Sequence, residues 1–115
     1  MTFGGLATTL SQVAHGAPPW EGDMRPKFEW DHDKAAANFV KHRIDFDEAG
    51  TTFDDPYLVE TFDDAHSDVE PRRLAVGRSA SGRLLAVVYT ERGDKIRLIS
   101  ARPATRTERR RHDET

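Results

Sequence analysis

The chain has 115 residues, a formal net charge of −3 and no cysteine. A chain of this length forms one small domain with a modest core, and without cysteine it has neither a disulfide framework nor a thiolate metal site. The absence of cysteine favours a location in the reducing cytoplasm, because small secreted proteins usually depend on disulfides.

The charge is divided between two parts of the chain. Residues 45–70 contain ten Asp and Glu residues and no Lys or Arg, whereas residues 72–111 carry a net charge of +9. A basic half within an acidic protein indicates a polyanionic partner that contacts one face. A surface that contacts only solvent usually carries positive and negative charges intermixed. Nucleic acid is a candidate for that partner.

Residues 1–26 contain Gly, Pro and small polar residues without a sustained period, which predicts a flexible N-terminal extension. Met24 is an alternative first residue. This segment has neither the basic start and unbroken apolar run of a signal peptide nor the length of a membrane span. We expect the folded domain to cover residues 27–115 and to lack a membrane segment.

A short strand and a helix are predicted next. Lys27–Trp30 has the composition of a strand, and Asp31 is a typical N-cap for a helix that ends near His42. The basic residues at its end complement the negative end of the helix dipole. The expected inner face of this helix consists of Ala35, Ala36, Phe39 and Val40.

A second helix is predicted to form a hairpin with the first. Asp45 and Glu48 have the spacing of a capping box, and Ile44 and Ala49 stand at the positions of a hydrophobic staple. One face of this helix carries Phe46, Ala49 and Phe53.

Four strands are predicted after Asp54-Asp55-Pro56, at residues 57–62, 73–78, 83–90 and 95–101, with a loop over residues 63–71. Turn signals at Ser81-Gly82 and Gly93-Asp94 predict an antiparallel meander whose central strand is apolar on both faces. One face of the sheet is predicted to be solvent-exposed and basic, because the last strand carries Lys95, Arg97 and Arg102. The fold class is therefore α+β.

A last helix begins near Arg106, because Thr105 and Glu108 form another capping-box pattern. Residues 106–115 contain no apolar side chain, and an isolated helix of this length is marginal in water. We expect this helix to be frayed or held by a partner.

The motifs along the chain resemble those of the BrnT toxins, members of the wider RelE and ParE group. The resemblance covers about residues 27–112. Arg43 is a departure, because the family usually has Gly at this turn, so Arg43 must adopt a left-handed conformation or reshape the turn. The matching motifs are F-E-W-D at 28–31, K-A-A-A-N at 34–38, K-H at 41–42, F-D-E-A at 46–49, F-D-D-P at 53–56, H-S-x-x-E-x-R at 66–72, V-G-R-S at 76–79, Y-T-E-R-G at 89–93, I-R-L-I-S-A-R-x-A at 96–104, and Glu108.

The resemblance implies a RelE-like fold and a toxin that cleaves RNA without metal. It also implies a BrnA-like antitoxin whose DNA-binding part is a ribbon-helix-helix, and repression of the operon through that antitoxin. Two alternatives remain open: a ParE-like toxin that inhibits a target protein by binding alone, and a plain nucleic-acid-binding module.

Metal-free RNA cleavage uses the ribose 2′-hydroxyl as nucleophile, so the protein must neutralise charge on the phosphate and transfer protons. Arginine suits the first task, because its fork pairs with two phosphate oxygens and stays charged. We expect four arginines in or beside the strands to meet on one surface, although Arg97 and Arg102 could instead pair with Glu70 or Glu91. These four candidates are Arg72, Arg78, Arg97 and Arg102.

The candidates for proton transfer are His42, His66, Glu70 and Glu91, and His66 and Glu70 are preferred because they lie close to Arg72 in sequence. Tyr89 is a further possible proton donor or a strand residue that fills the core. The predicted RNA-binding set is Lys41, His42, Lys95 and Glu91.

Residues 63–68, D-D-A-H-S-D, contain hard-cation ligands but lack the loop glycine and distal Glu of an EF-hand. Nucleotide-binding and hydrolase motifs are also absent from the sequence, so neither a metal nor a cofactor is expected. An amphipathic or basic antitoxin segment is expected to cover the arginines, because the terminal helix and the acidic stretch 45–70 look incomplete alone.

Overall fold

The structure is a computed structural model that describes residues 26–62 and 71–114. Apart from Pro26, the predicted N-terminal extension lies outside these residues, as does most of the predicted loop over residues 63–71.

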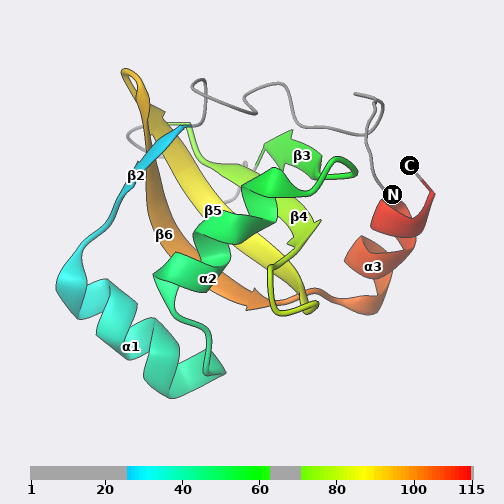
Figure 1. The fold of residues 1–115 in the computed structure, drawn as a ribbon, viewed down its shortest axis with the longest axis horizontal. Coiled ribbons are helices and arrows are strands. Elements are labelled where there is room, and N and C mark those ends of the chain that lie inside the picture. The colour runs from blue at the N-terminus through cyan, green and yellow to red at the C-terminus, as the bar shows by residue number, and fades with distance from the viewer. Residues whose placement is uncertain (1–25, 63–70, 115) are drawn as a thin grey trace.

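The described residues contain a five-stranded sheet with the order β2-β6-β5-β4-β3 (Figure 1). Strands β3 to β6 form the predicted antiparallel meander, whereas β2 pairs in parallel with β6 at one edge. The α+β class is confirmed, and the sheet is mixed because β2 runs parallel to β6 while all the other neighbouring strands are antiparallel. The strands are β2 (Lys27–Glu29), β3 (Val59–Phe62), β4 (Arg73–Arg78), β5 (Leu84–Arg92) and β6 (Lys95–Pro103).

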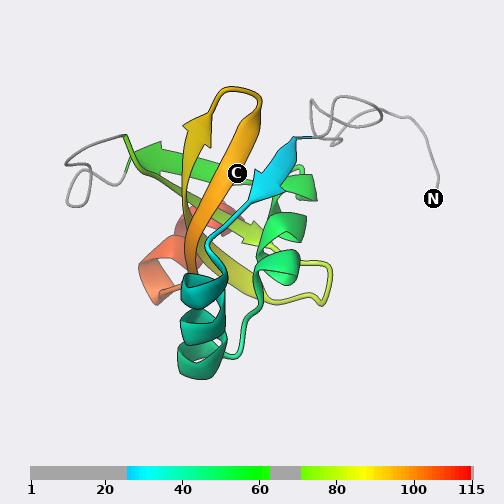
Figure 2. The same ribbon diagram turned by 90° about the vertical axis from the view of Figure 1, so that its left-hand side faces the viewer.

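The helices lie on two sides of this sheet. They are α1 (His32–His42), α2 (Phe46–Thr51), which continues into the 3₁₀ turn η2 (Thr52–Asp54), and α3 (Arg106–Asp113). Helices α1 and α2 contact β6, α3 contacts β4, and Figure 2 shows α2 and α3 on opposite sides of the sheet. We call these sides the α1/α2 face and the α3 face.

Most of the apolar core lies on the α1/α2 face. Side chains alternate between the faces of a sheet, so alternate residues of β5 enter this core and pack against α2 and η2. Ile44 and Ala49, the predicted staple residues, both belong to it. The cluster comprises Ile44, Phe46, Ala49, Phe53, Ala75, Leu85, Val87, Tyr89, Leu98 and Ala101. A smaller cluster of Val76, Leu84 and Ala86 lies on the α3 face.

Helix α1 is rotated relative to the prediction. Its N-cap Asp31 is confirmed, since the carboxylate accepts from the amides of Asp33 and Lys34. The predicted inner face was wrong for Ala36, Phe39 and Val40, which are exposed.

The buried residue of α1 is Asn38. Its Nδ2 donates to the carbonyls of Ile44 (3.0 Å) and Ala101 (2.9 Å), and its Oδ1 accepts from the amide of Ala101 (3.0 Å). A buried backbone group needs a partner, so these three hydrogen bonds fix which side of α1 faces β6.

Arg43 takes the left-handed conformation required at the end of α1, with φ 59° and ψ 34°. Its amide donates to the carbonyl of Phe39 at 2.8 Å, which closes the last turn. Of the two possibilities that the sequence left open, the structure has the left-handed conformation and not a reshaped turn, in a residue type that rarely adopts it.

The predicted capping box of α2 is only half formed. The Asp45 carboxylate caps the amide of Glu48 at 2.7 Å, as expected. The Glu48 carboxylate, however, binds Arg83 and accepts from the hydroxyls of Ser79 and Ser81. Its pKa falls to about 2, because the bond from Arg83 outweighs the effect of burial. Glu48 therefore joins α2 to the β4–β5 hairpin.

Candidate functional site

Three of the four predicted arginines lie on the α3 face. Arg78 is paired with Leu84 across β4 and β5, Arg102 with Ala86, and Arg97 with Thr90 across β5 and β6. Leu84 and Ala86 belong to the α3-side cluster, while the intervening Leu85, Val87 and Tyr89 belong to the main core. Arg72 stands two residues before Leu74, which packs against the α3-side cluster, so strand alternation favours the same side.

The structure also gives several of these arginines protein partners. Arg97 donates to Glu29 at 3.1 Å, and Arg102 makes a two-pronged ion pair with Glu108 at 2.8 and 2.9 Å. The partners considered from the sequence were Glu70 and Glu91, whereas Glu29 and Glu108 were not anticipated. The exposed Arg78 donates to the carbonyl of Gly82 at 3.0 Å. A guanidinium has five N–H donors, so one such bond leaves others for a phosphate.

Helix α3 is anchored by polar side chains of its own chain, which contradicts the expectation that it is frayed or held by a partner. His112 is buried, and its Nε2 lies 2.8 Å from the Asp55 carboxylate. The Glu108 carboxylate accepts from the Thr105 amide, and the Glu108 amide donates to the Thr105 hydroxyl, so this capping box is confirmed. Polar pairs can thus position a helix that has no apolar side chain.

Asp55 is the residue to which α3 is attached. Its carboxylate accepts from the amides of Tyr57 and Arg78, each at 2.8 Å, as well as from His112. Burial raises the pKa of Asp55, but these hydrogen bonds outweigh it and lower the pKa below its usual value. The bond to Tyr57 also holds a turn, so that β3 begins at Val59 and not at Tyr57 as predicted.

The predicted RNA-binding residues do not form one group. Lys41 and His42 lie at the end of α1, on the α1/α2 side of the sheet. Lys95 lies 3.9 Å from Glu29, which also binds Arg97, so Lys95 is associated with the α3-face arginines. Glu91 instead pairs with Arg73 at 3.4 Å.

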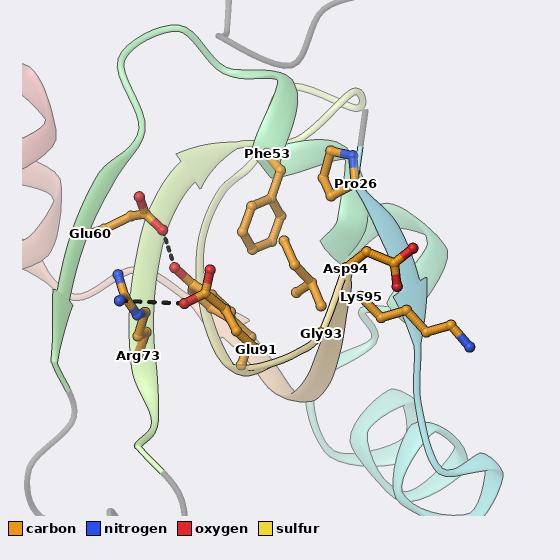
Figure 3. Close-up of a pocket in the computed structure, with 10 residues that line it drawn as sticks. Pro26, Phe53, Glu60, Arg73, Glu91, Gly93, Asp94 and Lys95 are labelled. Carbon is orange, nitrogen blue, oxygen red and sulfur yellow. Dashed lines mark hydrogen bonds and ion pairs between the residues drawn. The ribbon is translucent and has the colours of Figure 1, made fainter. Parts of the chain in front are cut away.

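A cleft of about 240 Å³ lies between η2, β3 and the β5–β6 hairpin (Figure 3). Tyr89 is buried beside it, and its hydroxyl donates to the Glu60 carboxylate. Burial first, and then this hydrogen bond, raise the pKa of Tyr89. Tyr89 therefore stays protonated at neutral pH. Its side chain belongs to the core on the α1/α2 face, opposite Arg78, Arg97 and Arg102. The cleft is lined by Pro26, Phe53, Glu60, Arg73, Tyr89, Glu91, Gly93, Asp94, Lys95 and Ile96.

His66, Glu70 and the sequence 63–68 that was tested for metal ligands lie outside the described residues. Within residues 26–62 and 71–114, no group of three or more His, Asp or Glu side chains could hold a metal ion. No helix in the same part of the chain is long and apolar enough to cross a membrane.

Sequence reasoning missed Asn38 and the pair of Asp55 with His112. Asn38 is a single amide in an otherwise apolar and basic stretch of helix, a position where an amide often bonds to a neighbouring backbone. Asp55 precedes Pro56, an arrangement typical of turn initiation. The contact of His112 with Asp55 could not be predicted from the local sequence, because the two residues are 57 positions apart in the chain.

The fold and this surface define a class of protein: a small α+β domain whose sheet is covered by two helices on one face and carries strand-borne arginines on the other. A family model described as "Ribonuclease toxin, BrnT, of type II toxin-antitoxin system" matches residues 30–108. The chain therefore belongs to the BrnT family of ribonuclease toxins. An antitoxin partner and an RNA substrate are implied by this membership.

The fold is similar to that of the Brucella abortus ribonuclease toxin BrnT, known from a crystal structure. The TM-score is 0.54 and the sequence identity 23%, and the similarity covers 70% of this chain and 99% of that one. No curated protein sequence gives a significant match.

Proposed function

We propose that the α3 face cleaves RNA and that the protein is an endoribonuclease that acts in the cytoplasm without metal. The observation that supports this most strongly is the placement of Arg78, Arg97 and Arg102 on one face by the strand register. Cationic side chains on a rigid sheet are suited to a polyanionic substrate, because they are held in place before the substrate binds.

The proposed reaction is attack of the ribose 2′-hydroxyl on the adjacent phosphorus, with departure of the 5′-oxygen. Arg78 would bind the scissile phosphate and stabilise the charge that grows on its oxygens, and Arg72, at the other end of β4, would bind a neighbouring phosphate of the RNA. His66 and Glu70 are the proposed proton-transfer groups, one taking the 2′-hydroxyl proton and the other protonating the leaving oxygen.

Arg97 and Arg102 belong to the same proposed RNA-binding surface, and each has a carboxylate partner. Arg97 is paired with Glu29 and Arg102 with Glu108, and these ion pairs would hold the two guanidinium groups in place before RNA binds. Burial raises the pKa of Glu108, but the hydrogen bond from Arg102 is the larger effect and keeps the pKa below its usual value. Lys95 would extend the phosphate-binding surface. Lys41 and His42, at the end of α1, and Glu91, which pairs with Arg73 beside the cleft, are not included in it.

We further propose that a BrnA-like antitoxin with a ribbon-helix-helix DNA-binding part neutralises the toxin. In this proposal the antitoxin contacts operator DNA, so that the toxin regulates its own operon only through its partner. Co-purification of the two chains, and binding of the operator by the complex but not by the toxin, would support this arrangement.

Cleavage of a labelled RNA in EDTA tests the catalytic proposal. We expect Arg78→Ala to lower the rate by about 100-fold, the usual effect of removing one donor that stabilises transition-state charge. Arg78→Lys keeps the charge without the fork and should retain part of the activity. Lys34→Ala removes an exposed cation from α1 and serves as the control. Intact RNA with the wild type, or equal rates for wild type and Arg78→Ala, would contradict the proposal.

A further inference from the structure

Helix α3 carries four arginines that the proposed reaction does not use. The inward side of the helix is set by Glu108, which binds Arg102, and by His112, which is four residues further on and contacts Asp55. At 100° per residue, Arg106 and Arg110 lie on the opposite, outward side, and the two other arginines flank them. All four are exposed, and we call them the helix arginines: Arg106, Arg109, Arg110 and Arg111.

The helix arginines adjoin the proposed RNA-binding surface. Helix α3 packs against β4, the strand that ends at Arg78 (Figure 1). Glu108 ties the helix to Arg102. Close to the end of α3, His112 lies 2.8 Å from Oδ2 of Asp55, the same oxygen that accepts from the Arg78 amide. An RNA that passes over Arg78 and Arg102 can therefore continue along α3.

The charge of α3 is unfavourable for the helix itself. Cations near the C-terminus of a helix are stabilising, which accounts for Arg110 and Arg111. Arg106, however, is the first residue of α3, at the positive end of the helix dipole. It also stands three and four residues before Arg109 and Arg110, the spacings at which like charges repel each other. The helix therefore loses stability through these cations, although it has no apolar side chain that could compensate.

Carboxylates of the chain leave this basic surface available. With respect to the carboxylates of residues 26–62 and 71–114, none of the helix arginines forms an ion pair. Asp113 lies toward the same side of α3, and its carboxylate is 3.9 Å from Nδ1 of His112. All the cations of α3 are arginines, whose planar fork matches two oxygens of one phosphate.

We propose that the helix arginines bind phosphates of the RNA substrate beyond the cleavage site. The inference rests on the proposed function, because it takes RNA to be cleaved on the α3 face, and it adds the outward side of α3 to the path of the RNA. These cations contact no reacting atom, so they increase affinity without changing the chemical step. An acidic protein segment fits less well, because α3 adjoins the strand arginines to which RNA binding is assigned.

The test compares a short RNA of about 4 nucleotides with a long one of about 16, the range of site sizes on single-strand-binding surfaces. Binding to the full-length protein is measured by fluorescence anisotropy with 2′-O-methylated RNA, and cleavage with natural RNA. The variants are Arg106→Gln, Arg110→Gln and the two combined. Lys34→Gln removes one exposed cation from α1, across the sheet from α3, and is the matched control for the single variants.

We expect each single variant to weaken binding of the long RNA by about 3-fold and the double variant by about 10-fold, as for exposed ion pairs. The slope of log K against log salt should become shallower by about 0.7 for each arginine removed. Binding of the short RNA should not change, nor should Lys34→Gln change binding of either RNA. The double variant should raise KM for the long RNA at constant kcat, whereas Arg78→Ala lowers kcat.

The attachment of α3 is verified by NMR through the Arg78 amide, because its partner Asp55 also holds His112. Removing repelling cations should leave α3 at least as stable, so this signal should stay in place and the melting temperature should not fall. If the double variant does release the helix, Arg106→Gln alone decides the question, because it removes the cation that the helix dipole disfavours.

Equal affinities of the wild type and the double variant for the long RNA would overturn the inference while leaving cleavage at Arg78 intact. An equal loss for the short and the long RNA would also overturn it, since the cations would then act at the cleavage site. The same loss for Lys34→Gln as for Arg106→Gln would indicate a general effect of net charge and would again contradict it.

Two further outcomes concern the identity of the ligand. If the wild type neither binds nor cleaves RNA, the proposed function fails and this inference fails with it. If the double variant binds RNA as the wild type does but no longer binds the purified product of the neighbouring reading frame, the helix arginines bind an acidic protein segment and the inference is wrong.

Discussion

The two faces of the sheet are built by different means. On the α1/α2 face a continuous apolar cluster joins the sheet to two helices, with aromatic contacts such as Phe53 against Tyr89 at 5.1 Å between ring centres. On the α3 face a smaller apolar cluster is surrounded by ion pairs and by the contact of His112 with Asp55. Ion pairs near solvent contribute little to stability, whereas apolar burial contributes most of it.

The difference suggests a division of roles. The α1/α2 face holds the sheet rigid, and the α3 face presents charged groups from that rigid support. Substitutions on the first face should therefore change stability more than activity per folded molecule, and substitutions of the arginines should do the reverse.

The largest stability effect is expected for Asn38→Ala. The substitution leaves the carbonyls of Ile44 and Ala101 and the amide of Ala101 without their partner, and each unsatisfied buried group costs about 1–3 kcal/mol. We expect the free energy of unfolding in urea to fall by about 3 kcal/mol or more. Lys34→Ala, an exposed change on the same helix, is the control, and an equal effect of the two would contradict the role assigned to Asn38.

A somewhat smaller loss is expected for Gly77→Ala. A Cβ at this position would lie 2.7 Å from the Leu58 side chain and 2.9 Å from the carbonyl oxygen of Thr52, so β4 would have to move away from η2. Overpacking of this kind costs about 1–3 kcal/mol. Thermal unfolding measures the change, with Gly82→Ala as a comparison at an open position whose φ is +91°. A Gly77→Ala variant as stable as the wild type would show that the two elements are not tightly packed.

Acid should weaken the link between α2 and the β4–β5 hairpin. The pKa of Glu48 is lowered from 4.5 to about 2, so its contribution is full above pH 4.5 and is lost as the pH falls toward 2. Solvent screening at the half-exposed Arg83 limits this contribution to roughly 2 kcal/mol. The free energy of unfolding of Glu48→Gln should therefore vary less between pH 5 and pH 2.5 than that of the wild type. The same slope in both proteins would exclude Glu48 as a source of acid sensitivity.

The smallest effect is expected for Arg43→Gly. A non-glycine residue in the left-handed region costs about 1–2 kcal/mol, but glycine adds entropy to the unfolded chain and removes the contact with Phe39. The net result should be a gain below about 1 kcal/mol, seen as a rise of a few degrees in the melting temperature. A fall in the melting temperature would indicate that the Arg43 side chain stabilises the fold by more than its backbone strain costs.

The sequence predicted most elements because their signals are local. Asp31 and Asp45 cap their helices, Ser81-Gly82 and Gly93-Asp94 separate the strands, and Thr105 with Glu108 starts α3. The start of β3 was predicted two residues too early, because the Asp55 carboxylate accepts from the amide of Tyr57 and holds a turn there. The parallel pairing of β2 with β6 could not be read from either segment alone.

The rotation of α1 was predicted wrongly for a physical reason. Apolar periodicity identifies the more hydrophobic side of a helix, but not whether that side meets the core or another molecule. Here a single amide that bonds to two distant backbone positions determines the buried side. The placement of the arginines on one face could be inferred from strand alternation, whereas their partners Glu29 and Glu108 depend on tertiary structure.

The central claim is that RNA binds the α3 face. It is tested most directly by adding a short RNA whose 2′-hydroxyls are all methylated, so that it lacks the nucleophile and cannot be cleaved, and following the backbone amides by NMR. We expect the largest shifts at residues 72–78 and 97–102, with little change along α1. Shifts concentrated on α1 or around the cleft beside Tyr89, with none in those two strand segments, would contradict the account.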